Sequence, residues 1–98
     1  MQTAIAGAIS GAVRQSPSAG VTTYPLDDDM VVCDEQSGEI FLLNPTGAEI
    51  WALLDGSRTN RAVARAIAKK YHLDYHQAIQ DVDSLVVELA NAGLLRAN

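Results

Sequence analysis

Apolar residues in the first half of the chain occur in three short runs, separated by polar and turn-forming residues. The runs are "VTTYPL" (residues 21–26), "MVVCD" (residues 30–34) and "EIFLL" (residues 39–43). Their length and their β-branched and aromatic residues are typical of strands. A turn at residues 27–29 and a loop ending at Gly38, which tolerates positive φ, connect them as hairpins. The last run is apolar at four successive positions, so we expect both of its faces to contact apolar groups.

The pattern then changes to helical periodicity, and the first helix has marked start and stop signals. Thr46 and Glu49 form a capping box, with Asn44 as a competing cap, and Gly56 is the expected stop. The expected buried stripe of this helix consists of Ile50, Trp51, Leu53 and Leu54.

Two more helices follow, joined by short connections. The second is expected at residues 59–71. The third is expected at residues 75–92, with Asp74 and Gln77 at its start and Gly93 as its stop. The expected buried positions of the second helix are Val63, Ala66 and Ile67. The third helix has an apolar arc of roughly 160°, wide enough to serve the core and still border a groove.

The order of elements predicts an α+β, winged-helix-like fold, in which a three-stranded antiparallel sheet is followed by three helices. Residues 1–20 are rich in Ala, Gly and Ser, which offer little surface to bury, so we expect a flexible or loosely packed tail there. Ordered structure is expected to begin near Val21, and residues 21–98 are expected to form one domain.

Composition narrows the class of partner. The chain has 98 residues and a net charge of -5, which disfavours nucleic acid and anionic membrane surfaces as partners. Its one cysteine, Cys33, excludes an internal disulfide, and the apolar start of the chain lacks the basic residues of a signal peptide. We therefore expect a cytoplasmic protein.

Several polar clusters have the residue types of a chemical site but lack its pattern. His72 and His76 are four residues apart, as in helical zinc sites, but Asp74 caps a new helix between them and no third ligand stands out. The acidic turn at residues 27–29 lacks the ligand spacing of calcium loops. Cys33 lies in an apolar run and is interpreted as an inert core thiol. We expect neither a metal nor a cofactor.

Two other functions stay open as weaker alternatives. Ser84 in "DSLVVEL" resembles the serine of acyl carrier proteins, but it lies in the middle of a predicted helix rather than at its start. A winged-helix regulator would bind DNA through its third helix, yet residues 75–92 contain three acids and no Lys or Arg. The basic residues gather on or beside the second helix, at Arg58, Arg61, Arg65, Lys69 and Lys70. No nucleophile–base pair or phosphate loop is present, so we do not expect an enzyme.

The stretch "LNPTGAEIWALLDG" (residues 43–56) and the helices after it resemble the PqqD-like family, the recognition elements for ribosomally made, post-translationally modified peptides. The order and spacing of the matching features are specific. The resemblance covers residues 21–95. The matching features are Leu43–Asn44, Thr46–Gly47, Ile50–Trp51, Leu54–Gly56, Thr59, Asp81–Val82, Leu85, Glu88–Leu89 and Gly93–Leu95.

The resemblance implies a non-catalytic protein that binds the leader of a precursor peptide. The leader would add as a fourth, antiparallel strand along the third strand, in the cleft beside the third helix, by β-augmentation. The expected binding surface consists of the backbone of Glu39, Ile40, Phe41, Leu42 and Leu43 together with Val82, Asp83, Val86, Val87 and Ala90 of the third helix. Asp83 is expected to attract a Lys or Arg of the leader, and Asp81 with Glu88 is the alternative acidic border. The resemblance also implies a second partner, a peptide-modifying enzyme such as a radical enzyme, a protease or a cyclase.

Overall fold

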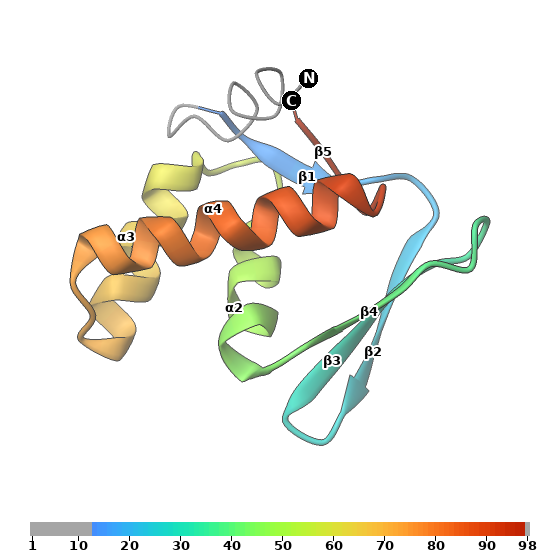
Figure 1. The fold of residues 1–98 in the computed structure, drawn as a ribbon, viewed down its shortest axis with the longest axis horizontal. Coiled ribbons are helices and arrows are strands. Elements are labelled where there is room, and N and C mark those ends of the chain that lie inside the picture. Colours follow the sequence, from blue (N-terminus) through green and yellow to red (C-terminus); the bar gives the residue numbers. More distant parts are fainter. Residues whose placement is uncertain (1–12, 98) are drawn as a thin grey trace.

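A three-stranded sheet lies beside three helices, and a two-stranded ribbon forms a separate small sheet (Figure 1). The computed structural model describes residues 13–97. The elements are, in chain order, β1 (Gln15–Pro17), β2 (Val21–Leu26), β3 (Asp29–Asp34), β4 (Ile40–Leu43), α2 (Pro45–Leu53), α3 (Asn60–Tyr71), α4 (Tyr75–Asn91) and β5 (Leu95–Ala97). The expected α+β, winged-helix-like class is confirmed.

The larger sheet has the order β2-β3-β4, with both pairs antiparallel. Val32 of β3 pairs with Phe41 of β4, and Met30 pairs with Leu43. These two rows face the helices, since Val32 and Leu43 are buried. Ile40 and Leu42 alternate with these positions and are 65% and 57% exposed, because successive side chains of a strand point to opposite faces. Both faces of this strand therefore have apolar neighbours in the sheet, but the side chains on its outer face are exposed to solvent.

The start of α2 resolves the choice between two caps. The Asn44 side chain accepts a hydrogen bond from the Gly47 backbone N–H at 2.8 Å, so Asn44 rather than the expected capping box begins the helix. Glu49 is thereby free to link α2 to α3, where its carboxylate accepts hydrogen bonds from Lys70 and Tyr71. These bonds lower the pKa of Glu49 from its ordinary value.

Polar side chains cap the other two helices, and Asp74 is the cap that the sequence predicts. Thr59 and Asp74 each accept a hydrogen bond from the backbone N–H three residues further on. Within α3 the buried alanine is Ala64, whereas Ala66, which was expected to be buried, is exposed. Alanines occur at several neighbouring positions of α3, on different sides of the helix. Their positions in the sequence therefore do not show which alanine faces the core.

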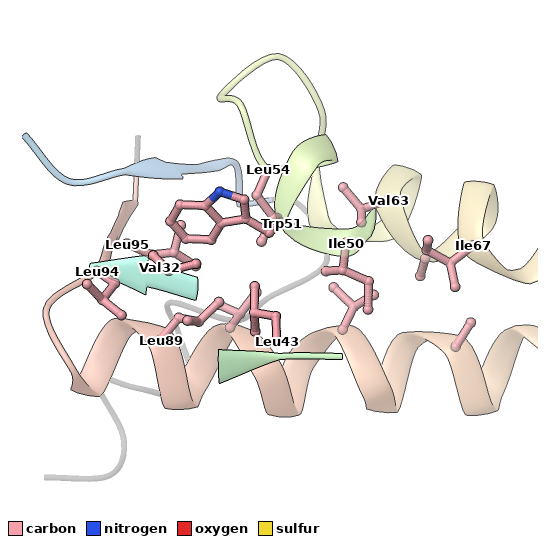
Figure 2. Packing of buried hydrophobic residues seen from close by; sticks show 14 residues of the cluster. Val32, Leu43, Ile50, Trp51, Leu54, Val63, Ile67, Leu89, Leu94 and Leu95 are labelled. Carbon is pink, nitrogen blue, oxygen red and sulfur yellow. The ribbon is translucent and has the colours of Figure 1, made fainter. Parts of the chain in front are cut away.

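The core lies between the inner face of the sheet and the helices. Figure 2 shows side chains from strands and helices meeting in one cluster, with Trp51 of α2 beside Val32 of β3. Ile50 of the same helix and Leu54, which caps its C-terminal end, are also buried, as expected, while Leu53 is only partly buried. Burying side chains of this size stabilises the fold by roughly 1.5–3 kcal/mol each. Trp51 therefore anchors α2 against the sheet.

The small ribbon corrects the expectation that ordered structure begins near Val21. β1 pairs antiparallel with β5, with Gln15 opposite Ala97 and Pro17 opposite Leu95. The Ser18 N–H also donates to the Leu94 carbonyl at 3.0 Å. A paired strand is not a loose tail, so the tail expected at residues 1–20 is wrong from residue 15 onward. Residues 1–12 of that predicted tail lie outside the described residues.

Candidate functional site

The outer edge of β4 carries unpaired main-chain groups. β4 pairs with β3 on one side, and no strand within residues 13–97 pairs with its other side. The Asp34 N–H donates to the Glu39 carbonyl at 2.9 Å, so Asp34 and Glu39 are a hydrogen-bonded pair of the β3–β4 ladder. Because antiparallel hydrogen bonding alternates along a strand, the N–H and C=O groups of Ile40 and Leu42 then point away from β3. This edge presents donors and acceptors to an added strand.

The opposite edge of the sheet, on β2, is less suited to strand addition. The Glu35 N–H donates to the Gly20 carbonyl at 3.1 Å, and the same alternation turns the backbone groups of Val21, Thr23 and Pro25 outward. Proline has no N–H to donate, so the row of donors on this edge is interrupted. Of the two edges, only the β4 edge therefore has an uninterrupted row of outward N–H donors and C=O acceptors.

A pocket of about 480 Å³ lies at the end of β4, between the start of α2 and one edge of α4. Ile50, Leu73 and Leu85 give it an apolar part, and Asp81 and Glu88 place two exposed carboxylates at its wall. The complete lining is Asn44, Thr46, Gly47, Ile50, Leu73, Asp81, Ser84, Leu85 and Glu88. The open edge of β4 thus leads directly into a half-apolar, half-acidic pocket.

The pocket shows which edge of α4 borders it. Asp81 and Glu88, the alternative acidic border, line this pocket. Asp83 and Val87 line a second hollow of about 360 Å³, which adjoins the pocket because Ser84 and Glu88 line both. Ala90 is exposed and lines neither hollow. The expected groove residues Asp83, Val87 and Ala90 therefore do not line this pocket, and their contact with a leader stays a prediction.

Two further expected residues belong to the core rather than to a surface. Val82 and Val86 are 0% exposed and lie in the hydrophobic cluster, so neither side chain is available to a peptide. The Leu43 side chain is also buried, but for this residue the expectation concerns the backbone. Of the expected strand residues, Glu39, Ile40, Phe41 and Leu42 retain exposed or partly exposed positions along the open edge. The backbone of β4 is thus accessible while the centre of the α4 arc is not.

The sequence interpretation missed the pocket residues Leu73 and Ser84. Leu73 is an exposed leucine in the loop between α3 and α4. The sequence does not show that this loop lies beside α2, so it does not indicate that Leu73 lines a pocket. Ser84 was weighed only as a carrier serine. It lines both hollows from the exposed side of α4.

The other candidate clusters do not assemble. Among residues 13–97, no group of three His, Cys, Asp or Glu side chains is close enough together to hold a metal ion. His72 ends α3 with φ of 55°, and His76 is exposed on α4. Cys33 is partly exposed rather than buried in the core, because it shares the outer face of the sheet with Ile40, its partner in register. In the same part of the chain, no helix has the length and hydropathy needed to cross a bilayer.

Comparisons with known proteins agree with this architecture. The family model for coenzyme PQQ synthesis protein D (PqqD) matches residues 29–95. The structure of TbiB1 in complex with the TbiA(beta) leader peptide has 30% sequence identity and a TM-score of 0.75, covering 83% of this chain and 94% of that chain. Lasso peptide synthetase B1 complexed with the leader peptide has 26% identity and a TM-score of 0.76, covering 85% and 98% respectively. A comparison with curated proteins found no match.

The family match runs from the start of β3 to the start of β5, and so includes the open edge of β4 and the whole of the pocket. It spans more than half of the chain, and the solved structures share the fold over most of their length. This chain belongs to the PqqD family.

Proposed function

We propose that this chain is a non-catalytic recognition element, which binds the leader of a ribosomally made precursor peptide and presents it to a peptide-modifying enzyme. The observation that carries the proposal is the open edge of β4 beside the pocket at its end. Two similar proteins of known structure, each described as a complex with a leader peptide, support it. A strand added to an exposed edge gains main-chain hydrogen bonds whatever its sequence, so selectivity must come from side-chain pockets.

The polarity of β4 sets how a guest strand lies. β4 runs from Ile40 toward Leu43 and ends at the pocket. An antiparallel guest therefore begins at the pocket and runs away from it, so a residue near the N-terminal end of the bound segment enters the pocket. Ile50, Leu73 and Leu85 favour an apolar side chain or an aliphatic stem there, and the two carboxylates at the wall favour a cationic group at its end.

Main-chain pairing is tested by removing one outward N–H. Leu42→Pro removes a donor from the open edge and leaves the β3–β4 hydrogen bonds in place, since the Leu42 backbone points away from β3. We expect the affinity for a fluorescently labelled synthetic leader, taken from the precursor peptide encoded beside this protein's gene, to fall by about tenfold or more. Fluorescence anisotropy measures it.

Leu42→Ala is the matched control. It keeps the N–H and shortens a side chain that is exposed on the outer face, so its leader affinity should stay within about threefold of the wild type. Circular dichroism verifies that both variants are folded. Equal leader affinity of a folded Leu42→Pro variant and the wild type would exclude strand addition at β4.

A further inference from the structure

The outer face of the sheet is an exposed apolar surface that adjoins the leader edge and extends beyond it to β2. Register places Tyr24, Val31 and Leu42 in one cross-strand row and Cys33 beside Ile40 in the next. Tyr24 and Leu26 of β2 are each 51% exposed. We define the outer sheet face as Tyr24, Leu26, Val31, Cys33, Ile40 and Leu42. The described helices lie on the other side of the sheet (Figure 1). Contiguous apolar patches of this kind mark interaction surfaces.

Acidic groups surround this face. The turn between β2 and β3 contains Asp27–Asp29, and Glu35 and Glu39 lie at the opposite end of the strands. Glu35 is held on the outer face itself, because its carboxylate accepts hydrogen bonds from Thr22 at 2.7 Å and from Tyr24 at 2.8 Å. These bonds lower the pKa of Glu35, so the group stays ionised near neutral pH. Between Arg14 and Arg58 the sequence contains no Lys, Arg or His to offset these charges.

This charge pattern selects the partner. An apolar centre with an acidic rim is complementary to a protein surface with an apolar centre and a rim of Lys or Arg. It disfavours a second copy of this chain, since two such faces would bring like charges together, and it disfavours anionic lipid and nucleic acid for the same reason. Ile40 and Leu42 connect the face to the leader edge, because their side chains lie on the face while their backbone groups lie on the edge.

We infer that the outer sheet face docks the peptide-modifying enzyme through an apolar patch rimmed by basic residues on that enzyme. The inference rests on the proposed function for its choice of partner. In this arrangement the enzyme contacts β4, the same strand that binds the leader. The rest of the precursor peptide then extends from the recognition element close to the enzyme.

The test combines two affinities. A Tyr24→Lys/Leu26→Lys variant changes β2, the strand furthest from the leader edge. Its control, Ala66→Lys/Gln80→Lys, adds the same charge at exposed positions on α3 and α4. The probes are the purified modifying enzyme encoded beside this protein's gene and the labelled leader. Calorimetry measures enzyme affinity, anisotropy measures leader affinity, and circular dichroism verifies folding.

We expect the β2 variant to lose about tenfold or more in enzyme affinity and to keep its leader affinity within about twofold. The control should keep both affinities, and the enzyme affinity of the wild type should fall as salt is raised. Unchanged enzyme affinity of the folded β2 variant overturns the inference, as does absence of enzyme binding by the wild type. A wild-type dimer in sedimentation that the β2 variant dissociates also overturns it, by naming a second copy as the occupant. Absence of leader binding by the wild type would instead count against the proposed function.

Discussion

Asp83 is a carboxylate in an unfavourable place. It is half-buried on α4, and one of its oxygens is buried without a hydrogen-bond partner. Burial raises the pKa of Asp83 above its ordinary value of 3.8, because removal from water penalises the charged form. The folded protein therefore holds this proton more tightly than the unfolded chain does. The contribution of Asp83 to stability is most favourable below pH 3.8 and is lost as pH rises through the raised pKa.

Asp83→Asn should consequently stabilise the protein in a pH-dependent way. We expect its melting temperature to exceed that of the wild type by about 2–4 °C at pH 7, and the difference to vanish as pH approaches 3.8. Thermal unfolding followed by circular dichroism across this range measures it. Asp28→Asn, in the exposed turn between β2 and β3, is the charge-matched control. A gain of the same size at every pH would show that ionisation of Asp83 is not the cause.

At the scale of elements, α4 has three faces with different tasks. Its central stripe, which includes Val82 and Val86, is core, one edge lines the pocket, and the solvent side carries the second hollow. Substitutions one or two residues apart on this helix should therefore have different effects.

The helix is tested by comparing Ser84→Tyr with Val86→Glu. Ser84 is exposed at the pocket, so a tyrosine there should fill space that the leader needs and lower leader affinity by about tenfold, with helicity unchanged. Val86→Glu places a carboxylate in the core and should unfold the protein. Ser84→Ala is the control that leaves the pocket open. Anisotropy measures leader affinity and circular dichroism measures helicity. Undiminished leader binding by Ser84→Tyr would show that the pocket is not part of the leader site.

At the scale of the whole molecule, the ribbon of β1 and β5 joins the two ends of the described chain. Leu95 is buried in the main cluster while the next residue, Arg96, is exposed. The ribbon thus fixes the end of α4 to the rest of the core, and the start of β1 is held by pairing with it.

Leu95→Ala should therefore cost about 2–4 kcal/mol in the free energy of unfolding, because it leaves a cavity in the shared core. Arg96→Ala should change it by less than about 0.5 kcal/mol. Urea denaturation measures both values. Equal effects would mean that the ribbon does not contribute to the core.

The sequence by itself determined the features that depend on neighbours within a few residues. A cap needs one side chain and an N–H three residues on, so Asp74 could be predicted as the cap of α4. The three strands of the sheet and the order of the helices followed from local periodicity in the same way. Asn44 and Thr46 were both capable caps, and the path of the chain from β4 into α2 decided for Asn44.

Only the tertiary structure decided which surfaces face one another. The pairing of β1 with β5 joins short segments about eighty residues apart, and three-residue strands carry no periodicity to detect. The broad apolar arc of α4 was visible in the sequence. Each edge of the arc has an acidic residue, Asp81 on one and Asp83 on the other, so the pattern does not show which edge borders a groove. Packing against α2 and the loop at Leu73 placed the Asp81 edge at the pocket. The sequence of a helix determines how its side chains are arranged around the helix axis. Only contacts with other elements determine which of its sides faces which neighbour.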